Sequence, residues 1–327
     1  MKIVVMDPGI MNLGDIRWDY LSKYGDLTVY DCEDSLKTHE EVIEAMRDAE
    51  IAVIHQSEIK MDLLEACTKI KYISLTSVGF DMAQTDAMKY ARQKGIAISN
   101  LAGYGPMTIA QHAMALLLEL TNHVGEFRTE VTEGRWRASK DIAGNTNRLS
   151  MMELSGKTLG IVGYGKIGSS VATLARAFGM HVLTFSPYST ESAKQEIEHV
   201  SFDALLAASD VISLHCPLTK DTAGIINAEV IAKMKDGVLL INTARGGLIN
   251  EADLADALKN GKIRAAGVDV VSKEPIRPEN PLLGIPNCVI TPHAAWVSNE
   301  TRQRMVYCIG DNIEAYLKGN PICVVNG

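Results

Sequence analysis

The sequence predicts an α/β protein made of two doubly wound parallel-sheet domains. Short, uniformly apolar runs alternate with helical patterns along the chain, and this alternation occurs as two separate series. Such runs are typical of strands that are buried on both faces of a parallel sheet. The length of 327 residues and the hydrophobic fraction of 46% allow each domain a core of its own.

The first series closes near Asn100 and is predicted to contain buried strands joined by helices. A helical pattern, EEVIEAMRDAE, occupies residues 40–50 between the second and third of these strands. The predicted strands are residues 2–7, 27–31, 51–56, 72–77 and 96–100.

A long helix is expected from about Met107 to Asn122. Its sequence is apolar nearly all round toward the middle, as in helices that are covered on more than one side. We therefore expect it to be buried between domains or subunits, and its excess of apolar surface predicts a homodimer. The alternative is a helix that is buried inside a single chain.

The second series begins after a polar stretch at residues 137–150 and shows the βαβ alternation of a doubly wound sheet. We expect helices to separate its strands. A last helical pattern, residues 300–319, follows the series and has to pack against another part of the chain. The predicted strands are residues 158–163, 181–186, 211–216, 238–243, 265–270 and 288–293.

Composition and charge exclude several classes of partner. The net charge of −8 argues against a basic surface for nucleic acid or anionic lipid. No apolar run is long enough to span a bilayer, and the N-terminus lacks the hydrophobic stretch of a signal peptide. Six cysteines are scattered without C-x-x-C spacing, and no cluster has the spacing of metal ligands. We expect a cytoplasmic protein with reduced thiols and no bound metal.

A G-x-G-x-x-G motif follows the first strand of the second series and opens a helix. Gly163 permits the tight turn, Gly165 lets the backbone approach a pyrophosphate, and Gly168 lets helix and strand pack closely. The N-terminus of the helix then faces the anion. A bare glycine motif also occurs for packing alone, but a strand before it and a helix after it favour a Rossmann dinucleotide site.

Polar residues occur at the ends of successive strands of this second series. Since ligands bind at the carboxyl ends of the strands in open α/β sheets, these residues are expected to share one site. They are His215, Cys216 and Pro217; Thr243, Ala244 and Arg245; Asp269 with Glu274; and His293.

The strings VISLHCPLT, LLINTARGGLINEADL, GVDVVSKEP and TPHAAW resemble the D-isomer-specific 2-hydroxyacid dehydrogenases in order and spacing, and the resemblance covers nearly the whole chain. The opening residues and the string AGYGPMTIAQHAMALLLEL look most like the glycerate dehydrogenase, or hydroxypyruvate reductase, branch. The resemblance implies a flavodoxin-like, discontinuous substrate domain of residues 1–102 and 294–327, and a Rossmann cofactor domain of residues 103–293. It places the active site in the cleft between them and a helix equivalent to residues 107–122 at a two-fold interface.

The reduction of a 2-keto acid needs a hydride from nicotinamide, a proton for the carbonyl oxygen and a cation for the carboxylate. His293 is the candidate acid and base, since imidazole titrates near neutral pH. Glu274 would orient His293 and favour its protonated form, and Arg245 would bind the keto-acid carboxylate. All three residues match the family's catalytic Arg, Glu and His. The non-catalytic alternatives are a surface carboxylate for Glu274, a loop cap for His293 and a pair with Glu251 for Arg245.

The resemblance also implies the remaining site residues. Asp269 is expected on the nicotinamide carboxamide, and the backbone amides of Val78 and Gly79 on the substrate carboxylate, although the loop departs from the family pattern near Gln84. The expected cofactor-binding residues are Gly163, Gly165, Lys166, Ile167, Gly168, Ser186, Cys216, Thr243, Ala244, Arg245, Asp269 and His293.

The choice between NAD and NADP depends on the end of the second strand of the Rossmann domain. Ser186 stands where NAD-binding relatives carry an aspartate that repels a 2′-phosphate. No basic residue follows before Lys194, so a partner for that phosphate is missing as well. We therefore expect NAD(H) as the cofactor, with NADP(H) possible.

The best hypothesis is an enzyme that reduces hydroxypyruvate to D-glycerate. Glyoxylate, pyruvate, 2-ketoisocaproate or phenylpyruvate are alternative substrates, and a non-catalytic, corepressor-like dinucleotide sensor is an alternative of another class. Arg245, Glu274 and His293 occurring together favour the enzyme. His215 and His55 are expected to be structural or to lie beside the ligands. The histidines without an assigned function are His39, His112, His123, His181 and His199.

Overall fold

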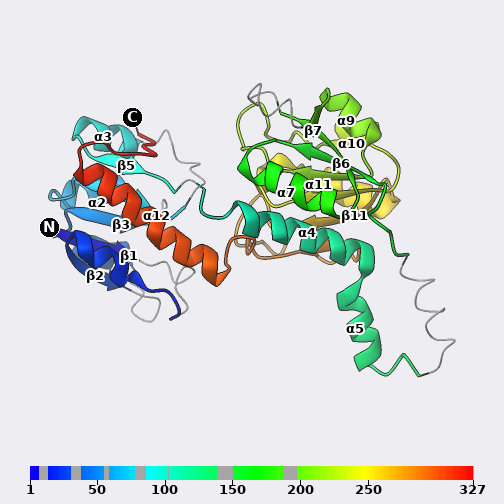
Figure 1. Ribbon diagram of the computed structural model, residues 1–327, viewed down its shortest axis with the longest axis horizontal. Helices are drawn as coiled ribbons and strands as arrows, with labels where there is room; N and C mark the ends of the chain where they lie inside the picture. The colour runs from blue at the N-terminus through cyan, green and yellow to red at the C-terminus, as the bar shows by residue number, and fades with distance from the viewer. Residues whose placement is uncertain are drawn as a thin grey trace. The chain divides into compact units, whose positions relative to one another are not determined.

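The computed structural model describes residues 1–6, 14–30, 38–54, 59–77, 86–101, 103–137, 150–186 and 197–326. The chain forms two compact units (Figure 1). The first consists of Met1–Gly105 together with Trp296–Gly327, and the second of Pro106–Ala295.

The first unit contains a parallel sheet with the order β2-β1-β3-β4-β5, the order of flavodoxin-like folds. Nearly all residues of the three central strands, β1, β3 and β4, are buried, and most of them are apolar. The strands are β1 (Lys2–Met6), β2 (Asp26–Tyr30), β3 (Ile51–Ile54), β4 (Tyr72–Leu75) and β5 (Ala97–Ser99).

Helices cover both faces of this first sheet. One face packs against α1 (His39–Met46), α2 (Met61–Ala66) and α3 (Asp86–Gln93). The other face packs against the 3-10 helix η1 (Trp18–Tyr24) and α12 (Asn299–Leu317), the last helix of the chain. Figure 1 shows α12, in red, lying across the first unit. The final helix thus returns to the sheet that the N-terminus begins.

The second unit contains a parallel sheet with the order β12-β11-β10-β9-β6-β7-β8. The chain runs outward from β6 in both directions, first through β7 and β8 and then through β9 to β12, which is the topology of a Rossmann fold. The strands are β6 (Thr158–Val162), β7 (His181–Phe185), β8 (Glu198–His199), β9 (Val211–Leu214), β10 (Val238–Asn242), β11 (Ile263–Val268) and β12 (Cys288–Ile290).

The second sheet also has a helical layer on each face. α4 (Pro106–Asn122) and α7 (Lys166–Ala177) share a core with one face. The other face packs against α9 (Phe202–Ala208), α10 (Ala228–Lys233) and α11 (Glu251–Asn260). The remaining elements are α5 (Val124–Thr132), which follows α4, and the 3-10 helix η3 (Gly246–Leu248) before α11.

The predicted fold class is confirmed, but three details of the prediction were wrong or incomplete. No helix separates β11 from β12 in residues 269–287, all of which the structure describes. Four prolines occupy this segment and remove helical N–H donors. The strand β8 was not predicted, because its two residues are too few to give a sequence pattern. The buried side chains of α4, which were expected to lie between domains or subunits, pack within the second unit. The prolines are Pro275, Pro278, Pro281 and Pro286.

None of the helices in the described part of the chain is long and apolar enough to cross a membrane.

Candidate active site

The three glycines of the loop after β6 have two different roles. Two of them allow close backbone packing, and the third lies beside open space. A Cβ on Gly163, where φ is +98°, would lie 2.6 Å from the backbone nitrogen of Cys216. A Cβ on Gly168 would collide with the carbonyl oxygen of Gly163. Both glycines therefore allow close backbone packing. Apart from its two chain neighbours, no atom of the described residues lies within 4 Å of a Cβ built on Gly165.

The open space at Gly165 lies at the N-terminus of α7. Gly165 is the N-cap residue, and Lys166 and Ile167 form the start of the helix. Backbone N–H groups at a helix N-terminus bind phosphate groups through hydrogen bonds and the helix dipole. The Thr243 hydroxyl at the end of β10 is buried and has no hydrogen-bond partner in the part of the chain that the structure describes. An open cradle and an unsatisfied polar group fit a dinucleotide at this sheet edge.

Ser186 lies next to the glycine loop. It directly follows β7, where the backbone N–H of Gly163 donates to the carbonyl oxygen of Phe185 over 2.8 Å. A neutral hydroxyl therefore stands beside the loop in the position expected for an acid. The residues that follow, 187–196, lie outside the described part, including Lys194.

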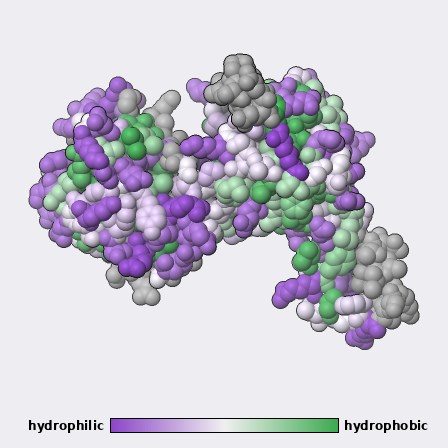
Figure 2. Space-filling model, in the orientation of Figure 1, coloured by the Kyte–Doolittle hydropathy of each residue, from purple (hydrophilic) through white to green (hydrophobic). Residues whose placement is uncertain are grey.

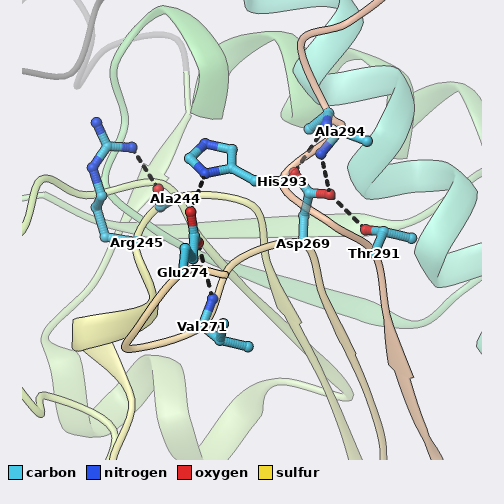
Figure 3. A network of polar contacts seen from close by, with 9 residues as sticks. Ala244, Arg245, Asp269, Val271, Glu274, Thr291, His293 and Ala294 are labelled. Atoms are coloured by element: carbon cyan, nitrogen blue, oxygen red, sulfur yellow. Dashed lines mark hydrogen bonds and ion pairs between the residues drawn. The ribbon is translucent and has the colours of Figure 1, made fainter. Parts of the chain in front are cut away.

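His293 and Glu274 form a close pair. His293 Nδ1 lies 2.6 Å from Glu274 Oε2, and Glu274 Oε1 accepts from the backbone N–H of Val271 over 3.2 Å (Figure 3). Since an ionised carboxylate only accepts, Nδ1 carries the proton and Nε2 is left for a substrate. The side chains of His293 and Glu274 are 43% and 37% exposed.

The electrostatics of this pair favour a protonated His293. The hydrogen bond that His293 donates to Glu274 raises the pKa of His293, and together with the charges of Glu274 and Asp269 it outweighs the opposing effects of burial and of the Arg245 charge. Burial alone would raise the pKa of Glu274, but the hydrogen bond and charge of His293 lower it. Each partner thus favours the charged form of the other, a carboxylate beside an imidazolium.

The backbone around His293 is fixed by Asp269 at the end of β11. His293 adopts φ of 54°, in the left-handed region, and its N–H donates to the Asp269 carbonyl oxygen over 2.8 Å. The Asp269 side chain, only 1% exposed, accepts from Thr291 Oγ1 at 2.5 Å and from the N–H groups of Ala294 and Ala295 at 2.8 and 2.9 Å (Figure 3).

Asp269 is ionised despite its burial. Burial alone would raise the pKa of its carboxyl, but hydrogen bonds from His112, Thr291, Ala294 and Ala295 lower it. Its carboxylate oxygens therefore serve the turn that carries His293. The expected contact between Asp269 and the nicotinamide carboxamide remains a prediction.

Asn242 shapes the turn that carries Arg245. Its Oδ1 accepts from the N–H of Ala244, and its Nδ2 donates to the carbonyl oxygen of Arg245, both over 3.0 Å. Arg245 itself donates from Nη1 to the Ala244 carbonyl oxygen over 2.7 Å (Figure 3). Sequence reasoning missed Asn242, although a polar residue that ends an apolar strand is a recognisable signal.

Gly246 and Glu251, which follow Arg245 in the chain, both contact the loop that leads to Glu274. A Cβ on Gly246 would collide with the backbone of Val271, so this glycine makes room for the loop that leads to Glu274. Glu251 accepts from Ser272 N and Oγ, both over 2.7 Å, and so holds the same loop. The close approach at Gly246 is thus one between two backbone segments of the protein.

His215 and Cys216 line the glycine loop from the end of β9. His215 Nε2 lies 2.8 Å from Ser213 Oγ, and burial lowers the pKa of His215 to about 4. Burial also raises the pKa of the Cys216 thiol. Both side chains are therefore neutral at pH 7, in accord with a structural role for His215. His55, Val78, Gly79 and Gln84 lie outside the described residues.

Comparisons with known proteins show which family the chain resembles. The D-isomer specific 2-hydroxyacid dehydrogenase NAD binding domain matches residues 114–295. The chain is 44% identical to a hydroxypyruvate reductase from Blautia hydrogenotrophica over 327 residues, which is 100% of both chains. It is 38% identical to a glycerate dehydrogenase from Methylorubrum extorquens over 294 residues, 89% of this chain and 90% of the relative.

A solved structure shows the same fold in complex with a dinucleotide. An acyclic imino acid reductase bound to NADPH and D-Arg has a TM-score of 0.83 and 30% identity, with 99% of each chain covered. These similarities define an oxidoreductase that uses a nicotinamide dinucleotide. More particularly, the chain belongs to the D-isomer specific 2-hydroxyacid dehydrogenase family.

We expect Gly165→Ala to preserve the fold and weaken NADH binding. Its backbone, with φ of −97°, accepts alanine without strain, and the added methyl meets no protein atom. The methyl would occupy space that the pyrophosphate needs, which costs about 1–3 kcal/mol, or roughly five- to 150-fold in Kd. Fluorescence titration with NADH and thermal melting measure the two effects.

Gly168→Ala is the contrasting variant, because its Cβ would collide with the Gly163 carbonyl oxygen. This variant is expected to lower Tm. An unchanged Kd for NADH in Gly165→Ala would contradict the placement of the pyrophosphate at this position.

Proposed function

We propose that the protein reduces hydroxypyruvate to D-glycerate with NADH. The His293–Glu274 pair carries this proposal, because a protonated imidazole with Nε2 directed away from its carboxylate partner is a suitable general acid. The choice of substrate is supported by the full-length similarity to a hydroxypyruvate reductase.

The bound nicotinamide supplies a hydride to the C2 carbon of the keto acid when it is present. His293 Nε2 donates the proton to the carbonyl oxygen, which gives the hydroxyl group, and the imidazole is left neutral. Glu274 stabilises the imidazolium before this transfer and fixes the ring so that Nε2 keeps its direction. Solvent then returns the proton to the half-exposed pair.

Arg245 binds the substrate carboxylate in this proposal. A guanidinium presents a planar set of donors that fits a carboxylate in two-point contact. Its charge is also close enough to oppose protonation of His293, so binding of the substrate carboxylate would offset that effect. The proposal also keeps two expected contacts: the backbone amides of Val78 and Gly79 with the substrate carboxylate, and Asp269 with the carboxamide.

A substrate panel tests the reaction. We expect NADH oxidation with hydroxypyruvate to be more efficient than with glyoxylate, pyruvate, 2-ketoisocaproate or phenylpyruvate. His293→Ala should lower kcat by about a hundredfold or more, as expected for loss of a general acid, and leave the Kd of NADH unchanged. His181→Ala, which removes an exposed histidine from β7, is the control.

Preference for a bulky apolar keto acid would overturn the proposal that hydroxypyruvate is the substrate. Dinucleotide binding without turnover of any keto acid would instead favour the sensor. Wild-type turnover by His293→Ala would exclude the proposed acid.

The pH dependence of reduction tests Glu274. Reduction needs protonated His293, so its rate falls as pH rises through the pKa of this residue. Glu274 raises that pKa, and Glu274→Gln should therefore move the fall to lower pH. The pH profile of kcat/KM measures this shift. Glu279 is an exposed carboxylate in the same segment, so Glu279→Gln should leave the pH profile unchanged and serves as the control. An unchanged profile in Glu274→Gln would contradict the proposed role of Glu274 in raising the pKa of His293.

We propose NAD(H) as the working cofactor, with weak discrimination against NADP(H). The family match to an NAD-binding domain supports NAD(H), and the neutral Ser186 beside the glycine loop supports weak discrimination. Ser186→Asp should raise the ratio of kcat/KM for NADH over NADPH by adding a charge that repels a 2′-phosphate. Ser186→Asn is the matched control, because asparagine is similar in size to aspartate but uncharged. A strong wild-type preference for NADPH would overturn this proposal.

We also propose a homodimer, on a different surface from the one the sequence suggested. The apolar side of α4 is already covered in its own chain. α5 extends away from the sheet of the second unit (Figure 1), and hydrophobic side chains gather on it and just beyond it (Figure 2). Val124, Val131 and Trp136 are 64%, 49% and 55% exposed, which favours an interface with a second copy.

Sedimentation velocity at several concentrations is expected to show a dimer. Val131→Asp should shift it toward the monomer, because a charge would be buried in the interface. Leu283→Asp, which changes another exposed apolar residue, should not. A wild-type monomer throughout would contradict the dimer.

Cytoplasmic localisation remains a proposal. Within the described residues no disulfide joins Cys67, Cys216, Cys288, Cys308 or Cys323, which is compatible with a reducing compartment.

A further inference from the structure

His112, on α4, contacts the turn that carries His293. Its Nε2 lies 3.0 Å from Thr291 Oγ1 and 3.3 Å from Asp269 Oδ1, and its side chain is 24% exposed. Sequence reasoning assigned it no function. α4 begins at Pro106, where the chain enters the second unit, whereas Ala295 is where the chain leaves it. His112 thus joins the first helix of this unit to its last residues.

The direction of these hydrogen bonds follows from proton counting. The single hydroxyl hydrogen of Thr291 is donated to Asp269 Oδ1 over 2.5 Å. Thr291 Oγ1 must therefore accept from His112, so His112 Nε2 carries a hydrogen. The donors point one way, from His112 through Thr291 to the buried carboxylate of Asp269.

Asp269 transmits this contact to the His293 backbone. Its carboxylate accepts from the N–H groups of Ala294 and Ala295, directly after His293, and its carbonyl oxygen accepts from the N–H of His293. A carboxylate that is 1% exposed depends on such donors, because water cannot replace them. Loss of one donor would disturb the whole turn.

We propose that His112 is a positioning residue for His293, acting through Thr291 and Asp269 to hold the left-handed turn that aligns the imidazole with Glu274. This inference rests on the proposed role of His293 as acid and base. His112 itself touches neither Glu274 nor the reacting atoms in this proposal.

The charged groups around the two histidines set the expected direction of change. Within the described residues, Glu274, Asp269 and Arg245 act on His293, and Asp269 is the charged partner of His112. Since the short contact to Glu274 is the main cause of the raised pKa of His293, a loosened turn should lower that pKa toward its ordinary value.

His112→Phe and His112→Gln separate the hydrogen bond from packing. Phenylalanine fills the space without a donor, whereas glutamine keeps an N–H donor. We expect His112→Phe to lower kcat for hydroxypyruvate about ten- to a hundredfold, since small displacements of catalytic groups have effects of this size. KM and the Kd of NADH should change little, and His112→Gln should recover most of the rate. Equal rates in the wild type and His112→Phe would overturn the proposal, as would a loss that His112→Gln does not relieve.

Thr291→Val provides a second test that does not require a change at His112. It removes the relaying hydroxyl at nearly constant volume, and we expect the same loss of kcat. The double variant with His112→Phe should lose less than the product of the two single losses, because both changes remove donors from the same carboxylate of Asp269. Additive losses would show two independent effects and contradict the relay.

A titration of the His293 imidazole by NMR, assigned through His293→Ala, needs no turnover. Its pKa should fall in His112→Phe and return in His112→Gln, while an unchanged or raised pKa in His112→Phe would reject the positioning role. This measurement distinguishes the two proposals. A wild type that reduces no keto acid defeats the proposed function, whereas an active wild type with an unaltered His293 titration in His112→Phe defeats only the role of His112.

Discussion

The buried carboxylate of Asp269 is the constraint on which the geometry of the site depends. It stands at the carboxyl end of β11, 1% exposed, and stays ionised because hydrogen-bond donors surround it. Those donors come from α4 and from the turn after β12, which lie far apart in the chain. An unmet carboxylate in the interior would cost several kcal/mol. The turn that carries His293 is therefore held by the need to satisfy this charge.

The two carboxylates of the site differ in environment and thereby in use. Asp269 is enclosed and accepts fixed donors, so its charge does not change through a reaction near neutral pH. Glu274 and His293 are partly exposed and share a single short contact. In the proposed mechanism the pair exchanges protons with the substrate and with solvent, while the enclosed carboxylate preserves the geometry of the pair. A rigid support beneath a titrating pair suits general acid catalysis.

Close backbone packing places the remaining groups around this pair. Gly163 and Gly168 bring the loop after β6 against the end of β9 and the start of α7, and Gly246 brings the Arg245 turn against the Val271 backbone. Side chains at these glycines would displace the cofactor loop or the segment that leads to Glu274. Gly165 differs, because no described side chain fills the space beside it. In the proposed function this space takes the pyrophosphate, so that glycine serves packing at some positions and binding at another.

The sequence by itself determined the fold class, the glycine loop and the candidate residues at the strand ends. Buried parallel strands give continuous apolar runs, and a phosphate-binding turn needs glycine at fixed spacing, so both signals are local. Only the tertiary structure decided that α4 is covered by its own chain, that Asn242 holds the Arg245 turn, and that His112 reaches Asp269 through Thr291. The distance between His112 and Thr291 along the chain explains why no local pattern reports this contact. Hydrogen bonds between distant segments depend on strand order and helix packing, which the spacing of residues along a sequence does not encode.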